Sequence, residues 1–516
     1  MGLATMHSRL ITLVIVSLVC FNTAWAQAAE EVTQARLGKI DYAVIVVYFA
    51  VLVYMGFYFS KREKNTEAFF LGGRKIPWWA VGISIFGTSL SAITYIAIPA
   101  SAFAGNWVGG FFNMGILLVA PFVAIVYIPR LLKEKHSTAY EYLEKRFNLP
   151  TRIYGSLCFA IFQLGRMSIV LYLPAIAMAA ATGIDIYFCI IAMGVLATLY
   201  TVLGGIEAVI WTDVIQSVVL LVGAILALVL IIMRIDGGLP VMIEMANAED
   251  KMHFATWTWD IYSAGVLVVV VGGTFSAAYP VMADQTVVQR YLSTSSPKEA
   301  AKALWVNAAM TLPMQLLFFG MGTALWVYYT TNPTELPADL QKDAIVPLFV
   351  VQQFPTGLKG LLIAGLFAAS MSSLDSSMNS LSSVLVNDYY KRFVPNVPEE
   401  RALFVARALT LLLGVLGTLG AVYVASTNDT TLFDKFVKLL GFVGGGLSGI
   451  FALGTLTKRA NGIGAFIGAV VSGILMYYTS KTEIHFYLHP VIGCMTAFVV
   501  GYVVSFILRK SKVDVG

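Results

Sequence analysis

The sequence carries little charge: only 12% of its 516 residues are Asp, Glu, Lys or Arg. Soluble domains usually contain about 25% charged residues, so this chain lacks the polar surface that a water-soluble protein needs. Hydrophobic residues make up 58% of the chain, which excludes a disordered protein. The composition therefore predicts an all-α protein that crosses a lipid bilayer many times.

Residues that build metal centres and nucleophilic active sites are also scarce. The 4 cysteines lie at unrelated positions in apolar segments, so neither a disulfide framework nor a zinc site is predicted. None of the 5 histidines lies in a polar membrane segment, which leaves a serine nucleophile without a base. The net charge of +5 is spread over short basic clusters and forms no continuous stripe. We expect no enzymatic activity and no nucleic-acid partner.

The N-terminus has the features of a secretory signal. Residues 10–21 are apolar, and Ala24-Trp25-Ala26 has the small-x-small form that signal peptidase cleaves. We expect residues 1–26 to be a signal peptide, with an extra N-terminal membrane segment as the alternative. Residues 27–40 then form a periplasmic segment outside the cytoplasm.

Long apolar runs predict about thirteen membrane helices of roughly 18–28 residues, the length that a tilted span requires. The predicted spans are 41–60, 78–103, 111–132, 153–182, 186–203, 209–233, 263–283, 303–329, 358–386, 404–424, 437–456, 463–480 and 488–508. Lys61 and Arg62 follow the first span, and the positive-inside rule places them in the cytoplasm. Alternation along the chain then puts Arg290 in a cytoplasmic loop. We expect a membrane domain over 41–508 in the cell inner membrane and a cytoplasmic C-terminal tail over 509–516.

Two predicted spans are rich in hydroxyl groups and helix-breaking residues. The second contains Gly87-Thr88-Ser89 and then Pro99, and the seventh contains Gly272-Gly273-Thr274 and then Pro280. Irregular backbone survives in a bilayer only where protein or a water-filled cavity satisfies it. Broken helices at matching places, five helices apart, are typical of an inverted-repeat transporter with its site near the midplane. Close packing of small residues is the alternative explanation for the glycines.

The ninth span carries a polar face. Ser372, Asp375, Ser376 and Asn379 follow i, i+3, i+4, i+7 spacing, so they lie on one side of a helix. A carboxylate inside a membrane is costly unless it is paired or binds a cation. Hydroxyl, carbonyl and carboxylate oxygens suit a small hard cation. We therefore predict a cation site on this face.

Two further charged residues fall within the predicted spans. Arg166 lies about 20 Å along the fourth span, too deep to reach the headgroups, so it needs an anionic partner. That partner is either a protein carboxylate, Asp375 or Asp213, or the carboxylate of a substrate. Asp213 lies near the start of the sixth span, where it is either a cap on the helix dipole or part of a site.

The segment from Tyr200 to Asp213, with Gly204-Gly205-Ile206-Glu207 at its centre, resembles the signature of the sodium:solute symporter family. The stretch 82–94, Gln289-Arg290-Tyr291 and the run Ser372–Ser377 resemble that family as well, and the resemblance covers about 41–508. The chain looks most like the bacterial sialic acid symporters, with sugar and organic-acid members as close relatives. The resemblance implies a LeuT-like fold of two inverted five-helix repeats, with alternating access driven by Na⁺.

The resemblance also implies which residues bind the ligands. The first sodium site uses the backbone or hydroxyl oxygens of Gly87, Leu90, Ala369, Ser372 and Ser373. The second sodium site uses Asp213, Ser372, Asp375 and Ser376. The implied solute-binding residues are Ser89, Ser91, Thr94, Asn113 and Arg166. In this assignment the arginine pairs a sugar-acid carboxylate bidentately.

Three positions depart from the sialic acid symporters: Asp375 replaces a serine, Asn113 a glutamine and Gly109 an aromatic residue. The first change leaves the number of sodium ions open at one or two, and the other two leave the solute open. We expect a monomeric, sodium-coupled importer of sialic acid (N-acetylneuraminate) or a related sugar acid. A sodium-coupled sugar or monocarboxylate symporter is the alternative. Outside this class stand an ion channel, whose repeated pore loops the sequence lacks, and a solute sensor without transport.

Overall fold

The computed structural model describes residues 37–61, 64–90, 92–253, 257–336, 344–427 and 432–508. The predicted signal peptide, Ser91 and the tail 509–516 lie outside the described residues. The described residues form helices and no strand. In chain order these are α2 (Lys39–Ser60), α3 (Thr66–Leu71), α4 (Trp78–Ser89), α5 (Ala92–Ala104), α6 (Phe111–Phe122), α7 (Ile128–Leu131), α8 (Ala139–Arg146), α9 (Leu149–Thr182), α10 (Ile186–Arg234), α11 (Gly238–Ala248), α12 (Val266–Met282), α13 (Gln285–Leu292), α14 (Pro297–Thr331), α15 (Ile345–Gln353), α16 (Leu358–Val384), α17 (Lys391–Phe393), α18 (Glu399–Thr427), α19 (Leu432–Leu456), α20 (Gly462–Thr479) and α21 (His489–Ile507).

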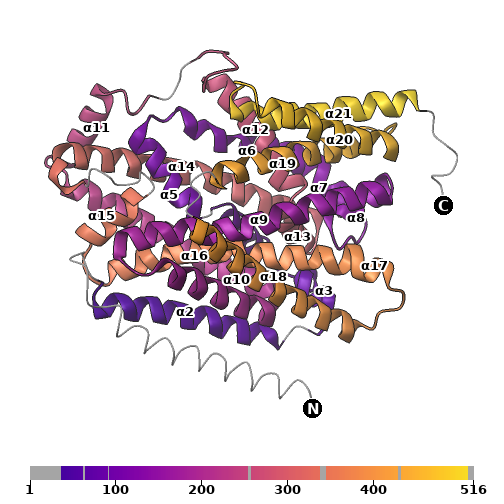
Figure 1. The fold of residues 1–516 in the computed structure, drawn as a ribbon, viewed down its shortest axis with the longest axis horizontal. Helices are drawn as coiled ribbons and strands as arrows, with labels where there is room; N and C mark the ends of the chain where they lie inside the picture. The colour runs from indigo at the N-terminus through magenta and orange to yellow at the C-terminus, as the bar shows by residue number, and fades with distance from the viewer. Residues whose placement is uncertain are drawn as a thin grey trace. The chain divides into compact units, whose positions relative to one another are not determined.

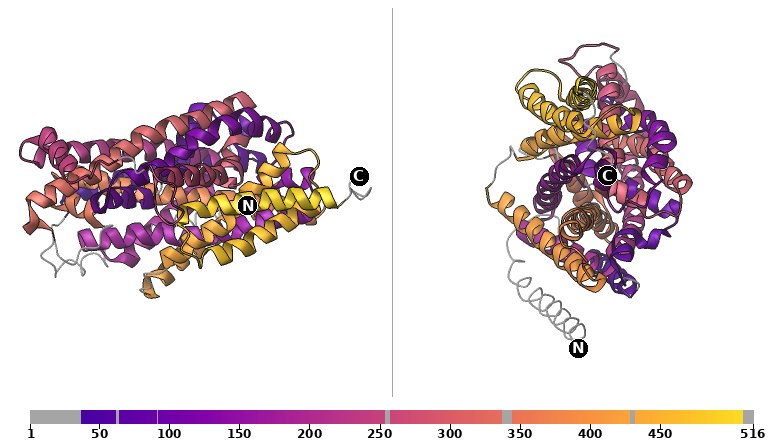
Figure 2. Two further views of the ribbon diagram at one scale, coloured as in Figure 1. Left: turned by 90° about the horizontal axis from the view of Figure 1, so that it is seen from above. Right: turned by 90° about the vertical axis from the view of Figure 1, so that its right-hand side faces the viewer.

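Each predicted span falls on one of these helices or on a consecutive pair, except that the spans 186–203 and 209–233 are the two arms of α10. By length and apolar composition, 9 helices of the described residues can cross a membrane, or 11 if each of two bent pairs is one span. The other two predicted spans are the second arm of α10 and α19, whose shorter apolar segment is Gly444–Leu456. In the right-hand view of Figure 2, most long helices are seen nearly end-on and run in roughly one direction.

Gly205 divides α10 into two helices. The element is 49 residues long, so a straight helix would be more than twice as long as the ~30 Å hydrocarbon core is thick. Gly205 has φ 53° and ψ −151°, a conformation that is essentially restricted to glycine. It also packs on the chain before α4, where an added Cβ would lie 2.5 Å from the Phe69 carbonyl oxygen. The arms 186–204 and 206–234 therefore act as separate spans.

Two pairs of helices form the broken spans. α4 bends by 55° against the segment Thr94–Ala104 of α5, and α12 bends by 54° against α13. The second break falls after Pro280, between Met282 and Gln285, and the glycine pair at 272–273 stays helical. Tyrosine hydroxyls satisfy the carbonyls there: Tyr127 donates to Met282 O, and Tyr140 donates to Ala283 O at 2.9 Å. Protein groups thus replace the lost helical hydrogen bonds, as a membrane requires.

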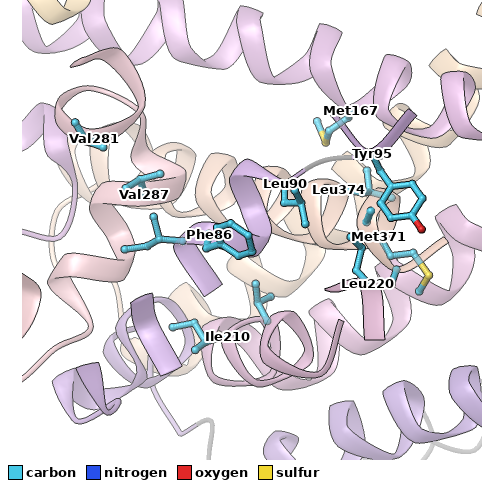
Figure 3. Close-up of a cluster of buried hydrophobic side chains, with 14 of the residues drawn as sticks. Phe86, Leu90, Tyr95, Met167, Ile210, Leu220, Val281, Val287, Met371 and Leu374 are labelled. Carbon is cyan, nitrogen blue, oxygen red and sulfur yellow. The ribbon is translucent and has the colours of Figure 1, made fainter. Parts of the chain in front are cut away.

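Helix α16 lies at the centre of the described fold. It packs against α2, α9, α10 and α18, which Figure 1 shows around it, and 94% of its most apolar window is buried. Several of its serines bond back to their own helix, such as Ser380 Oγ to Ser376 O at 2.7 Å. Leu90 of α4, Leu220 of α10 and Met371 of α16 belong to one buried apolar cluster (Figure 3). A hydroxyl-rich helix is therefore enclosed on all sides by other helices.

We predict that Gly205→Ala lowers the melting temperature of the purified protein and its yield. An alanine there must leave its allowed backbone region and collide with the Phe69 carbonyl, at a cost of about 1–3 kcal/mol for the strain alone. Gly473→Ala on α20 is the control, since its added Cβ meets nothing within 4 Å. That change should stabilise the helix by about 0.5–1 kcal/mol. Thermal unfolding in detergent measures both, and equal behaviour of the two variants would contradict the assignment of Gly205.

Candidate ion and solute site

Arg290 on α13 lies at the centre of the polar site. Its Nη2 donates to Asp213 Oδ2 at 2.8 Å and to Ser376 Oγ at 2.6 Å, and its Nε donates to Ser84 Oγ at 2.7 Å. Both partners of the Arg290–Asp213 ion pair are fully buried. One guanidinium therefore joins α13 to α4, α10 and α16. The prediction that Arg290 lies in a cytoplasmic loop is wrong, because the chain after the break turns back into the protein.

Asp213 is saturated with hydrogen bonds. Besides Arg290, Ser372 Oγ donates to its Oδ1 at 2.5 Å and Ser84 Oγ donates to its Oδ2 at 2.5 Å. It lies within the second arm of α10, well past Gly205. The interpretation of Asp213 as a helix cap is therefore wrong. A buried ion pair with further hydrogen bonds ties its elements together, because removal of one partner leaves an uncompensated charge.

Asp375 lies in the same network without a cation of its own. It is fully buried and accepts hydrogen bonds from Tyr200 OH at 2.5 Å and from Ser376 Oγ at 3.2 Å. Within the described ranges, no lysine or arginine forms an ion pair with it. Because Ser376 Oγ also accepts from Arg290, this hydroxyl links Asp375 to the Arg290–Asp213 pair. The structure thus brings together all four residues of the implied second site: Asp213, Ser372, Asp375 and Ser376.

The first implied sodium site lies where the end of α4 meets α16. Gly87, Leu90, Ala369, Ser372 and Ser373 are all buried, and α4 and α16 are in contact. The last carbonyls of a helix lack intrahelical partners, and α4 ends here because Leu90 leaves the helical conformation at φ −83° and ψ 74°. The Ser373 hydroxyl is buried with no hydrogen-bond partner. Uncharged oxygens with an unpaired hydroxyl fit a small hard cation.

Arg166 reaches the end of α4 from α9. Its Nη2 donates to Thr88 O at 3.2 Å, and no carboxylate forms an ion pair with it among the described residues. The interpretation of Asp213 or Asp375 as its partner is wrong, since Asp213 pairs with Arg290 and Asp375 with Tyr200. A guanidinium has five donors, and among the described residues the one hydrogen bond of Arg166 is that to Thr88 O.

The other implied solute residues are distributed over α4, α5 and α6. Ser89 is exposed although Thr88 and Leu90 on either side are buried, so its side of α4 faces accessible space. Thr94 on α5 and Asn113 on α6 are half-buried. No hydrogen bond of the described residues joins Asn113 to Arg166. The structure therefore places Ser89 next to the arginine contact at Thr88 and leaves Asn113 on α6, which packs against α12 and α14.

Two glutamines that are not among the predicted site residues complete the polar core. Gln289 Nε2 donates to Asn379 Oδ1 at 2.8 Å, which ties α13 to the polar face of α16. Ser377 Oγ donates to Gln163 Oε1 at 2.9 Å, which ties α16 to α9. All eight residues of α13 are buried. The sequence signal that could have identified this helix is the helical spacing of Gln285, Gln289 and Arg290 directly after the break. A loop does not require such spacing.

Comparison with known proteins identifies the family. A model described as the sodium:solute symporter family matches residues 69–472, well over half of the chain. The chain belongs to the sodium:solute symporter family. It is a multi-pass membrane transporter that couples a solute to sodium, and not an enzyme. The predicted family and coupling ion are confirmed.

Individual relatives agree with this assignment. The sodium/sialic acid symporter NanT of Aliivibrio fischeri is 38% identical over 475 residues, 91% of this chain and 93% of the relative. SiaT of Proteus mirabilis, which has the same description, is 38% identical over 481 residues, 92% and 96% of the two chains. The human sodium-coupled monocarboxylate transporter 1 is 29% identical over 438 residues, 83% and 71% of the two chains.

Two solved structures show the fold. One, the substrate-bound outward-open state of a Na⁺-coupled sialic acid symporter, is similar with a TM-score of 0.88 at 37% identity, over 92% of this chain and 99% of that one. The other is Mhp1, a nucleobase-cation-symport-1 family transporter, with a TM-score of 0.59 at 13% identity, over 86% and 96% of the two chains. The predicted inverted-repeat, LeuT-like fold is thereby confirmed.

We predict that the Arg290–Asp213 pair behaves as a unit in a double-mutant cycle. Arg290→Met leaves a buried, uncompensated Asp213 and should destabilise the protein by about 3–5 kcal/mol. Arg290→Met combined with Asp213→Asn removes both charges, so the double variant should be less destabilised than the sum of the single changes. Melting temperatures in detergent measure the coupling. Additive effects would show that the two groups do not interact in the folded protein.

Proposed function

We propose that the protein imports a sialic acid or a closely related sugar acid together with sodium. The observation that carries this proposal is Arg166, whose guanidinium donates to the Thr88 carbonyl and forms no ion pair with a carboxylate of the described chain. The buried carboxylate of Asp284 interacts with it electrostatically but without an ion-pair contact. An unpaired cation inside a membrane protein requires an anion, and a solute carboxylate supplies one in bidentate geometry. Two relatives at 38% identity are named sodium/sialic acid symporters, which supports a sugar acid as that anion.

The first sodium binds between α4 and α16 through Gly87, Leu90, Ala369, Ser372 and Ser373. Sodium at this point favours the conformation in which the two helices are joined, because a ligand shifts a conformational equilibrium by its differential affinity. The same conformation holds Ser89 and Thr88 O in place beside Arg166. Solute then binds to Ser89, Ser91, Thr94, Asn113 and Arg166, and the helices around the site move to open it to the other side.

A second sodium binds at Asp213, Ser372, Asp375 and Ser376. Counted as ionised groups, Asp213 and Asp375 contribute two negative charges to the network and Arg290 one positive charge. A single monovalent cation therefore neutralises the network, and Asp375, which has no cationic partner among the described residues, provides its charge. This supports two sodium ions per cycle.

The sodium gradient provides enough free energy for accumulation. A tenfold concentration ratio corresponds to about 1.4 kcal/mol, and about 100 mV adds roughly 2.3 kcal/mol per charge. One sodium can thus sustain a gradient of a neutral solute on the order of several hundredfold. A second sodium squares that factor for a neutral solute. For a sugar acid, the charge of the second sodium offsets the electrical cost of moving the anionic solute inward.

The orientation and setting follow from the charge pattern. We place the protein in the inner membrane of the cell as a monomer, with its membrane domain over 41–508. The signal peptide 1–26 is removed, 27–40 is periplasmic and the tail 509–516 is cytoplasmic. Basic clusters after alternate spans, beginning with Lys61 and Arg62, support this orientation through the positive-inside rule.

A monocarboxylate symporter is the second candidate function. Arg166 would pair any carboxylate, and a human monocarboxylate transporter is 29% identical to the chain. A thermal-shift screen of the purified protein separates the candidates, since a ligand that binds only the folded state raises the melting temperature. N-acetylneuraminate, neutral sugars and short monocarboxylates are each tested with sodium and with choline. We expect N-acetylneuraminate to raise the melting temperature in sodium but not in choline. If only the monocarboxylates raise it, the assignment of a sugar acid as the solute is rejected.

We predict that Ser372→Ala abolishes sodium-driven uptake. Ser372 is a proposed ligand of both ions and donates to Asp213, so the change removes an oxygen from each site. Uptake into proteoliposomes with an inward sodium gradient measures the effect. Ser472→Ala on α20 is the control, because this buried hydroxyl is bonded to Gly493 O and lies outside the network. Sodium stimulation retained in Ser372→Ala would count against both ion sites.

We predict that Arg166→Ala abolishes uptake of the acidic solute while sodium still stabilises the protein. The sodium ligands remain in place, but the carboxylate loses a charge-assisted pair. Arg166→Lys should retain weak uptake, since an ammonium keeps the charge without the bidentate geometry. Solute affinity is measured by competition and sodium binding by thermal shift. Unchanged solute affinity in Arg166→Ala would reject Arg166 as the carboxylate anchor.

A further inference from the structure

Ser217 on α10 has a buried hydroxyl that binds nothing in the described structure. Its side chain is 2% exposed, and its Oγ has no hydrogen-bond partner. Other hydroxyls of the same element bond back to their own helix, such as Thr201 Oγ1 to Ala197 O at 2.6 Å and Thr212 Oγ1 to Ala208 O at 2.9 Å. Buried polar atoms almost always have a partner. The Ser217 hydroxyl is therefore expected to bind a partner that the described residues do not provide.

The hydroxyl lies directly against the last turn of α4. A Cβ added at Gly87 would be only 2.4 Å from Ser217 Oγ, and the next nearest atom is Asp213 O at 3.5 Å. Gly87 is therefore required at this position because the Ser217 hydroxyl occupies the space of a side chain. The polar atom thus sits at the surface of α4 where that helix approaches its break.

Two contacts fix the level of Ser217 relative to α16. Asp213 lies opposite Ser372, whose Oγ is 2.5 Å from its Oδ1. Two turns later on α10, Leu220 Cα lies 3.7 Å from the Cβ position of Gly365. The two helices therefore run in opposite directions, and Ser217, between these contacts, is level with 368–369. Leu220 and Met371, labelled in Figure 3, belong to the apolar cluster at this level.

We propose that Ser217 Oγ is a further ligand of the sodium ion between α4 and α16. This inference rests on the proposed function, because it assigns another oxygen to the first sodium site. The hydroxyl is uncharged and buried, it touches Gly87, and it is level with Ala369, so it lies beside two of the implied ligands. A hydroxyl supplies a hard oxygen donor, the kind of atom that suits a hard cation. Sodium then joins three helices, α4, α10 and α16, and its affinity depends on the position of α10.

The test is a sodium titration of thermal stability with purified full-length protein in detergent. Ser217→Ala should raise the half-maximal sodium concentration about tenfold, the factor that corresponds to about 1.4 kcal/mol, with no change of melting temperature in choline. Ser382→Ala on α16 is the matched control: its buried hydroxyl is already bonded to Ala406 O at 2.9 Å, so its sodium response should equal that of the wild type. Proteoliposome uptake should show the same shift in sodium dependence.

A wild-type sodium response in Ser217→Ala would overturn the inference and leave the proposed function intact. Absence of any sodium response in the wild type would instead reject the proposed function. Should Ser217→Ala fail to fold, Ser217→Cys keeps the size but offers a soft sulfur ligand, and its unchanged sodium affinity would equally overturn the inference. Gly87→Ala provides a separate check of the contact: it should lower the melting temperature, and the second change Ser217→Ala should restore it.

Discussion

The buried pair of Arg290 and Asp213 is the interaction on which the rest of the site depends. It is the point at which both broken spans, the second arm of α10 and the central α16 are held to one another. Ser372 and Ser376, the hydroxyls proposed to hold sodium, take their orientation from this pair through direct hydrogen bonds. An ion that binds to those hydroxyls therefore acts on four helices through contacts that already exist.

The spans and the cation face could be predicted because their causes are local. A bilayer requires about 20 apolar residues per helix, and every such run in the described chain became a helix. Ser372, Asp375 and Ser376 were identified from helical spacing together with the cost of a buried carboxylate, and the structure places them in one network. The hydroxyls of the second span correctly indicated a broken helix; the break follows Ser89, and Pro99 lies within α5.

The predictions that were wrong concern residues whose positions depend on tertiary contacts, and a local sequence pattern does not contain these contacts. Arg290 follows a helix break, and positive charge after a span normally indicates a loop. Only its three partners on distant elements, Ser84, Asp213 and Ser376, explain why it is buried. Asp213 resembles a cap because the sixth span is predicted to begin at 209, whereas the second arm of α10 begins directly after Gly205. The sequence could not decide whether Arg166 pairs with Asp213, because only the structure shows that Asp213 pairs with Arg290. The orphaned Ser217 hydroxyl has no sequence signal at all, since its importance lies in its distance from Gly87.

The break between α12 and α13 has a mechanical consequence. Its two carbonyls, on Met282 and Ala283, are held by the phenol hydroxyls of Tyr127 and Tyr140, which carry no charge opposite them. Each of these hydrogen bonds contributes only about 0.5–1.5 kcal/mol, far less than parting the charges of Arg290 and Asp213 costs. The joint therefore has a charged side that is costly to separate and a neutral side whose individual hydrogen bonds are weaker.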